Sequence, residues 1–150
     1  MTTMDTAAPK QLPSLETIRE DFAFIEDWED RYSYIIELGR SLPSLDEAEK
    51  NDANKVNGCV SQVWLTAKSD EKNDNPTITF RGDSDAMIVK GLIAIAFGVF
   101  SGQRAKTILD TDALAVFEEF GLEEHLTPQR SNGLKAMVER IQAEAVSALQ

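Results

Sequence analysis

The side chain most able to do covalent chemistry is the thiol of Cys59, the only cysteine of the 150 residues. It directly follows Asn57-Gly58 and directly precedes an apolar run that starts at Val60. Gly58 can enter backbone conformations forbidden to other residues, and Asn57 tolerates them better than other non-glycine residues do. We therefore expect Cys59 on a turn at the start of a strand. The alternative is an inert, structural cysteine.

Two other side chains could act together with this thiol. Arg130 is expected in the first turn of a helix, where a cation opposes the helix dipole. Its charge could stabilise a thiolate or persulfide at Cys59, or it could form a surface salt bridge. His125 precedes the same helix and is expected to make a structural hydrogen bond. A Cys59–His125 hydrolase dyad is also compatible with the spacing, although no oxyanion motif supports it.

Further residues are expected to support the turn rather than to react. Asp83 and Asp85 are interpreted first as helix-capping groups. Trp64 is expected in the core, and Gln62 could orient the turn. Five residues form the predicted loop support: Gly58, Gln62, Trp64, Asp85 and Gly133, the last because a glycine within a good helix lets another segment approach.

Composition and charge limit the functional classes. The formal net charge of −11 argues against nucleic acid and anionic membranes as partners, and favours a partner with a basic face. One cysteine and one histidine allow neither an internal disulfide nor a zinc constellation. The first residues lack an apolar signal core, so we expect the cytoplasm, where a free thiol stays reduced. Residues 1–12 are predicted to be a disordered leader, and 13–150 a single domain.

Apolar periodicity predicts the elements that position these groups. Helices are expected over about 14–25 and 27–39 as an antiparallel pair. An acidic connector follows over 44–54, with a capping-box spacing between Ser44 and Glu47. Strands are expected after Cys59 to about Lys68, covered on both faces, and over 77–81, with a short edge strand at 55–56. Residues 82–85 should end the sheet and cap a buried helix over 86–100, before segments near 108 and 111–120 and a last helix capped by Thr127.

Three stretches carry a resemblance to a known family: 54–65 with its core Gly-Cys-Val-Ser-Gln-Val-Trp, 82–92 beginning Gly-Asp-Ser-Asp, and 125–137 with His-Leu-Thr-Pro-Gln-Arg-Ser-Asn-Gly. Together, in order and with compatible spacing, they resemble SufE-like sulfur acceptor proteins over about residues 14–147. The resemblance implies an α+β fold in which a small curved antiparallel sheet of about three strands packs against helices, as in SufE, NifU and IscU-like proteins.

The same resemblance implies a function. Such proteins take persulfide sulfur from a PLP-dependent cysteine desulfurase (SufS- or CsdA-like), stimulate it, and pass the sulfur to an iron–sulfur cluster scaffold (SufBCD-like) or another acceptor. The family's cysteine matches Cys59, and the chain would act as a sulfur-transfer protein without turnover of its own. It would need no metal or cofactor, because the PLP resides on the desulfurase and the persulfide is transient. The competing hypotheses are an acidic adaptor module with a structural cysteine, and the thiol hydrolase.

Overall fold

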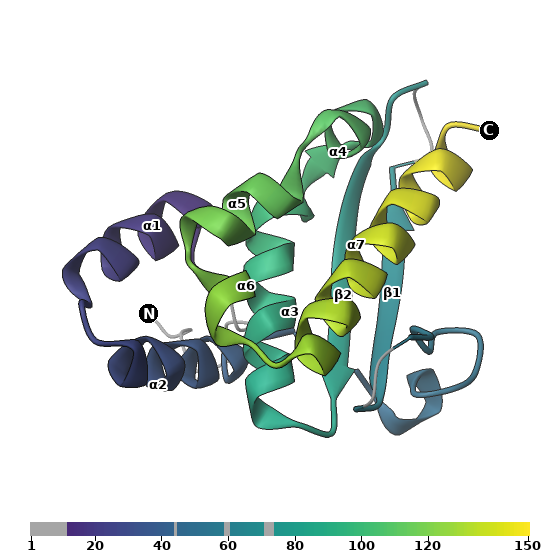
Figure 1. Cartoon of the computed structure of the whole chain (residues 1–150). Helices are drawn as coiled ribbons and strands as arrows, with labels where there is room; N and C mark the ends of the chain where they lie inside the picture. Colours follow the sequence, from purple (N-terminus) through teal and green to yellow (C-terminus); the bar gives the residue numbers. More distant parts are fainter. Residues whose placement is uncertain (1–11, 44, 59–60, 71–73) are drawn as a thin grey trace, which may run out of the picture.

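The computed structural model describes residues 12–43, 45–58, 61–70 and 74–150. The strands are β1 (Val63–Ser69), β2 (Thr77–Ser84) and β3 (Gln103–Arg104), and a short 3-10 turn, η2, spans Glu47–Glu49. The helices are α1 (Leu15–Phe24), α2 (Trp28–Gly39), α3 (Met87–Phe100), α4 (Ala105–Asp110), α5 (Ala113–Glu119), α6 (Leu122–His125) and α7 (Pro128–Ala148). Figure 1 shows α3 beside β2, with α7 passing in front of β2 and β1, and with α1 and α2 on the other side of α3.

The described strands form an antiparallel sheet in the order β1-β2-β3. β1 and β2 pair from Val63 opposite Ser84 to Ser69 opposite Ile78. The predicted α+β class with an antiparallel sheet of about three strands is confirmed. Residues 55–56 contribute only an isolated bridge between Lys55 and Trp64, so β3 is the third strand of the described sheet.

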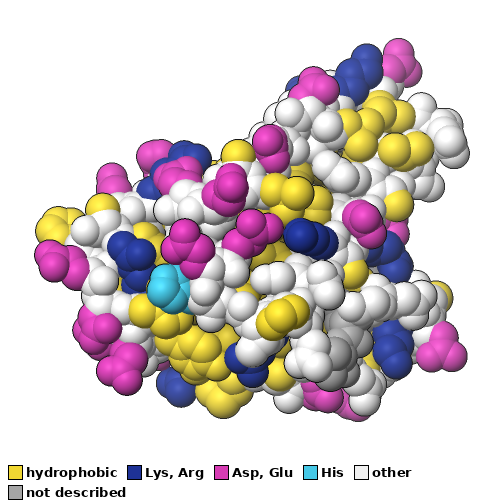
Figure 2. Space-filling model, in the orientation of Figure 1, with side chains coloured by type: hydrophobic (Ala, Val, Ile, Leu, Met, Phe, Trp, Pro, Cys, Tyr) yellow, Lys and Arg dark blue, Asp and Glu magenta, His cyan; other side chains and the backbone are white. Residues whose placement is uncertain are grey.

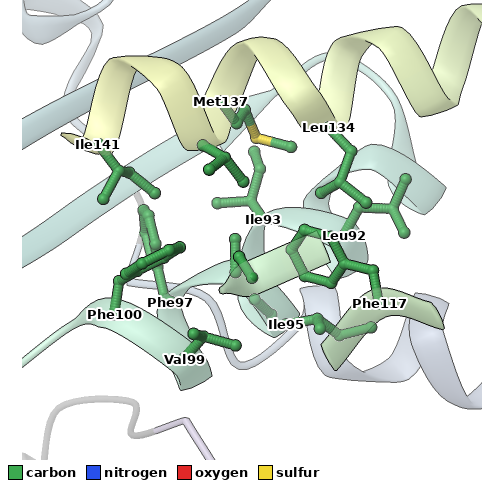
Figure 3. Close-up of a cluster of buried hydrophobic side chains, with 14 of the residues drawn as sticks. Leu92, Ile93, Ile95, Phe97, Val99, Phe100, Phe117, Leu134, Met137 and Ile141 are labelled. Atoms are coloured by element: carbon green, nitrogen blue, oxygen red, sulfur yellow. The ribbon is translucent and has the colours of Figure 1, made fainter. Parts of the chain in front are cut away.

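Helix α3 forms the centre of the core, as its nearly continuous apolar sequence predicts. Its side chains from Ile88 to Phe100 are almost all buried. Figure 3 shows Leu134, Met137 and Ile141 of α7 over this helix, with Phe117 of α5 at one end. The buried face of α7 is the predicted one, comprising Leu134, Met137, Val138, Ile141 and Ala145. α3, which follows β2, and α7, which is C-terminal, thus pack together in one core.

Helices α2 and α3 approach so closely that their contact needs glycine. A Cβ built on Gly91 would lie 2.0 Å from the carbonyl oxygen of Ile35, and one on Gly39 would lie 2.8 Å from the Gly91 nitrogen. No side chain fits at such distances, so the two backbones pack directly against each other. α1 and α2 are joined by side chains: Phe22 meets Tyr34 edge to face, and the Tyr34 hydroxyl donates to Asp21.

The prediction for residues 82–85 was wrong. Gly82, Asp83 and Ser84 continue strand β2 and are buried, instead of ending the sheet. The cap residue of α3 is Ala86, which makes no side-chain capping bond, and neither Asp83 nor Asp85 caps the helix. The turn signals of this polar stretch were misleading because β1 pairs with it up to Ser84.

Other predicted boundaries also differ. β1 begins at Val63 rather than directly after the cysteine, and its second face is only partly covered, since Trp64 is half-buried and Lys68 is exposed. The amide of Asp46 donates to Glu49 at 3.1 Å, which places the capping pair two residues after the predicted one; Ser44 lies outside the described residues. Asp112, not Thr111, caps α5.

None of the described helices combines the length and the apolar composition needed to cross a bilayer. α3 is apolar but has 14 residues, and the 21-residue α7 is polar on one side. Residues 1–11 of the predicted leader lie outside the described part, and Leu12 packs against the core.

Candidate functional site

The site is defined by the residues around Cys59, because Cys59 and Val60 themselves lie outside the described residues. Gly58 precedes the cysteine with a φ of +95°, in the left-handed region that the sequence predicted for this turn. A Cβ built on Gly58 would lie 3.2 Å from the Cβ of Ala136. The chain therefore reaches Cys59 while lying against α7, about one helical turn after Gly133.

After Cys59, a pair of reciprocal hydrogen bonds fixes the chain at Gln62. The Gln62 amide donates to Asp85 Oδ1 at 3.0 Å, and the Asp85 amide donates to the Gln62 carbonyl at 3.3 Å. These bonds fix the start of β1 to the segment between β2 and α3. Both residues belong to the predicted loop support, but Gln62 takes part through its backbone and Asp85 anchors the loop rather than capping α3.

A cleft of about 220 Å³ adjoins Ser61, two residues after the cysteine. Its walls come from α3, from α7 and from the residue that caps α7. The described lining residues are Ser61, Val89, Leu92, Thr127, Gln129, Arg130, Gly133, Leu134 and Met137. Apolar side chains of α3 and α7 line this cleft together with the polar residues Ser61, Thr127, Gln129 and Arg130. Trp64, which the sequence places in the core, is not among the described lining residues.

Arg130 is the cation of this cleft. Thr127 caps α7 by accepting from the Arg130 amide at 3.3 Å, and Arg130 Nη1 donates to the Tyr32 hydroxyl at 3.2 Å. Within the described residues Arg130 forms no ion pair, so the surface salt bridge considered from the sequence is not found there. Its guanidinium is held by a neutral hydroxyl from α2, which leaves the positive charge available to the cleft.

Asp83 lies behind the site, directly opposite Trp64 in the pairing of β1 with β2. Its carboxylate accepts from the Ser84 amide at 2.8 Å and lies 3.4 Å from the ammonium groups of both Lys50 and Lys90. Burial alone raises the pKa of Asp83, but the Ser84 hydrogen bond and the two lysine charges outweigh it and hold that pKa below its usual value. Lys50 also lies over the Trp64 ring, 5.7 Å from its centroid.

His125 does not make the expected structural hydrogen bond to any described residue. Its ring is exposed and stacks on Trp28 of α2, with 4.1 Å between ring centroids. Figure 2 shows the single histidine above a hydrophobic patch that lies over α2, with acidic side chains on the surface beyond it. The described contact of the imidazole is thus an aromatic stack, typical of packing between α2 and α6.

Sequence reasoning missed Tyr32 and Met137 as parts of the site. Only the folded arrangement brings Met137 to the cleft and the Tyr32 hydroxyl to Arg130, and no local signal separates the two residues from ordinary core positions. The described residues also bring together no cluster of three or more His, Cys, Asp or Glu side chains that could hold a metal ion.

Comparison with known proteins decides the family. The model of the SufE family, described as an Fe-S metabolism associated domain, matches residues 16–145. The chain belongs to the SufE family. An uncharacterised SufE-like protein of Rhizobium meliloti is 50% identical over 138 residues, covering 92% of this chain and 99% of the relative. Another, of Rhizobium etli, is 51% identical over 134 residues, covering 89% and 90%.

A solved structure supports the fold. The solution structure of a hypothetical protein from Thermus thermophilus superimposes with a TM-score of 0.70, covering 93% of this chain and 98% of the other, at 22% identity. Membership of the SufE family places the chain in iron–sulfur metabolism, with the general role of a sulfur acceptor. The sequence-based recognition of the family is thereby confirmed.

Proposed function

We propose that this SufE-family chain accepts sulfur on Cys59 from the persulfide of a PLP-dependent cysteine desulfurase and passes it to an iron–sulfur cluster scaffold. The observation that carries the proposal is the placement of the residues on both sides of Cys59. Gly58 lies against α7, and Ser61 lines a cleft that also contains the cation Arg130. Cys59 lies between Gly58 and Ser61 in the sequence, in a segment that adjoins the apolar cleft and the positive charge of Arg130.

The transfer step is a thiol–disulfide type of exchange. The Cys59 thiolate attacks the outer sulfur of the desulfurase persulfide, and a new S–S bond forms on Cys59. The bond between the outer sulfur and the desulfurase cysteine breaks, and that cysteine leaves as a thiolate that takes up a proton. The oxidation level of the moved sulfur does not change, so no separate oxidant, metal or cofactor is needed on this chain.

The cleft residues suit the needs of this step. A cation near the cysteine favours the thiolate over the thiol, and Arg130 supplies a cation to the cleft that Ser61 also lines. The apolar floor limits access of water and small thiols to a bound persulfide. Gly58 carries no side chain, which leaves room for the partner's sulfur to approach. Stimulation of the desulfurase follows, because removal of its persulfide frees its cysteine for the next turnover.

The decisive experiment combines the purified chain with a cysteine desulfurase and cysteine, and measures the intact mass. We expect the mass of one added sulfur on the wild-type chain, removed again by a reducing thiol. The matched control is Cys59→Ser, which should fold with an unchanged melting temperature and gain no sulfur. If the wild-type chain gains no sulfur, or if Cys59→Ser gains as much, the proposal fails.

The same preparation separates the competing hypotheses. An adaptor module with a structural cysteine would bind its partner without any mass change and would lose stability as Cys59→Ser. A thiol hydrolase would turn over esters or amides without desulfurase and would depend on His125. His125→Ala should therefore leave sulfur acceptance unchanged under the proposed function, since the described contact of this ring is the stack on Trp28.

A further inference from the structure

A second guanidinium on α7 holds the segment that leads to the cysteine. Arg140 Nη2 donates to the carbonyl of Ala53 at 2.9 Å, and Nη1 donates to the carbonyl of Lys55 at 3.1 Å. The remaining edge of the guanidinium is oriented by Glu144, whose carboxylate accepts from Arg140 Nε at 3.1 Å. The Arg140 side chain is 25% exposed, so these bonds are partly shielded from water.

The backbone of this segment alternates between two neighbours. The carbonyl of Asn54 accepts from Leu65 and the amide of Val56 donates to Val63, both at 2.8 Å on β1. The carbonyl of Ala53, in the turn over 52–54, and that of Lys55, at the bridge to Trp64, both accept from Arg140. Because only Lys55 bridges to β1 and no further strand lies beyond it among the described residues, Arg140 supplies the bonds to these two carbonyls.

We propose that Arg140 is a positioning residue for sulfur acceptance, fixing the point at which the chain leaves the sheet edge towards Cys59. The proposal rests on the proposed function of Cys59. It gives the cysteine segment two fixed ends: the Arg140 bonds before Gly58, and the Asp85 bonds at Gln62 after it. Arg140 acts through the backbone and needs no contact with the sulfur.

The two anchors limit the positions that the Cys59 thiol can take when a partner binds. With both ends fixed, only the short segment 57–61 lies between the anchors, so few alternative placements of Cys59 compete with the productive one. Without Arg140, this end of the segment is held only by the two bonds of Asn54 and Val56 to β1, so it opens more readily and more residues share the freedom when it does. Reaction within the complex should therefore slow down, whereas recognition of the partner by the rest of the surface is unchanged.

The test uses the full chain and compares Arg140→Ala with Arg140→Lys and Arg104→Ala. Arg104 Nη1 also donates to a backbone carbonyl, that of Asn75 at 3.0 Å, but at β3 and away from the cleft. Two readouts are measured: hydrogen exchange of the Val56 amide without any partner, and sulfur acceptance by intact mass at increasing desulfurase concentration.

For Arg140→Ala we expect Val56 exchange to rise roughly tenfold, the size that loss of two charge-assisted bonds allows. The saturated rate of sulfur acceptance should fall by about the same factor, with the half-saturating desulfurase concentration within about twofold of wild type. Arg140→Lys keeps the charge but donates from a single nitrogen. In both readouts it should give values between those of wild type and Arg140→Ala. Arg104→Ala should match wild type in both readouts.

The outcomes are distinguishable from failure of the proposed function. A wild-type chain that accepts no sulfur removes that function and the positioning role with it, whereas Val56 exchange still shows whether Arg140 holds the segment. If Arg140→Ala exchanges faster but accepts sulfur at the wild-type rate, Arg140 is only structural and the proposal is overturned. Wild-type exchange in Arg140→Ala overturns it as well.

Discussion

Two glycine contacts in this molecule serve opposite purposes. At Gly91, a Cβ would lie 2.0 Å from the backbone oxygen of Ile35, inside the buried contact between α2 and α3. At Gly58, a Cβ would lie 3.2 Å from the end of a single side chain, that of Ala136, and the residue is exposed. The first contact allows no side chain at all. The second restricts the residue mainly through its φ of +95°.

This difference separates the scaffold from the segment that carries the chemistry. The α2–α3 contact lies within the apolar core, where packing is dense and small displacements are costly. The segment around Cys59 is held by a few hydrogen bonds at its two ends, and Gly58 lies against the single side chain of Ala136 on α7. Changes in the scaffold should therefore appear in stability, and changes around Cys59 should appear in sulfur transfer.

The largest effect is expected for Gly91→Ala. The new methyl group must displace the Ile35 carbonyl, so α2 has to move away from α3, at a cost of about 3 kcal/mol in the free energy of unfolding. Denaturant unfolding measures this loss. The control is Gly98→Ala on the same helix, where a Cβ would meet the flexible end of Ile18 at 3.3 Å and the Leu15 backbone only at 4.0 Å. Gly98→Ala should not lose stability, because the helix-propensity gain of about 1 kcal/mol offsets the small shift of Ile18, and equal losses for both variants would contradict the scaffold role of the close contact.

Asp83→Asn, also in the scaffold, should have the next largest effect on the free energy of unfolding. It leaves Lys50 and Lys90 without their shared carboxylate, but both ammonium groups reach water, so we expect a loss of about 1–2 kcal/mol at pH 7. Because the folded-state pKa of Asp83 is lowered, its charge stabilises the fold above the unfolded pKa, about 3.9. This stabilisation is lost as the pH falls through the lower folded-state value.

Unfolding of wild type and Asp83→Asn, compared from pH 7 down to pH 2, tests that assignment. The stability difference between them should be constant above about pH 5 and shrink below about pH 4. Asp74→Asn, at an exposed position between β1 and β2, should show no such difference. A gap between wild type and Asp83→Asn that persists at the lowest pH would mean that the hydrogen bonds of the carboxyl group, not its charge, make Asp83 important.

Gly58→Ala tests the segment that carries Cys59. Adopting a positive φ costs an alanine about 1 kcal/mol, part of which the exposed segment can relieve by shifting. Sulfur acceptance should fall further than stability does, by about tenfold, since the shift displaces the neighbouring thiol. Gly102→Ala is the matched control: its φ is +82° and no atom lies near its missing Cβ. It should lose similar stability and keep the wild-type rate of transfer.

The sequence predicted the scaffold better than the boundaries near the site. The apolar run of α3 and the periodic face of α7 had no competing interpretation, and both helices are where they were expected. Residues 82–85 were misread, because Gly, Asp and Ser favour turns locally whereas the register with β1 keeps them in the strand. The long-range pairing outweighed the local preference, and a sequence pattern does not contain that information.

The site shows the same limit. Cys59, Gly58 and Arg130 stood out by residue type and position, and the positive φ of Gly58 is confirmed. Asp85 was found as a support residue but for a different reason, since its bond to the Gln62 amide joins segments that are far apart in the sequence. Tyr32 and Arg140 had no local signal, because each acts on a segment more than eighty residues away.

Arg130→Ala should have the smallest effect on stability and sharpens the comparison most. Its described side-chain bond goes to the Tyr32 hydroxyl and is only partly buried, so its removal should cost about 0.5 kcal/mol or less. Sulfur acceptance should nevertheless slow by about threefold to tenfold, because the cleft loses its cation and the thiolate of Cys59 is less favoured. Arg130→Lys should recover part of the rate.

Lys135→Ala removes a cation from the same helix, one that pairs with Glu123 at 3.8 Å and does not line the cleft among the described residues, and it should leave the rate unchanged. Measuring the rate from pH 6 to pH 9 distinguishes the mechanism: the defect of Arg130→Ala should diminish at high pH, where the thiol ionises without help. An equal defect at every pH would assign Arg130 to contact with the partner instead of to the thiolate.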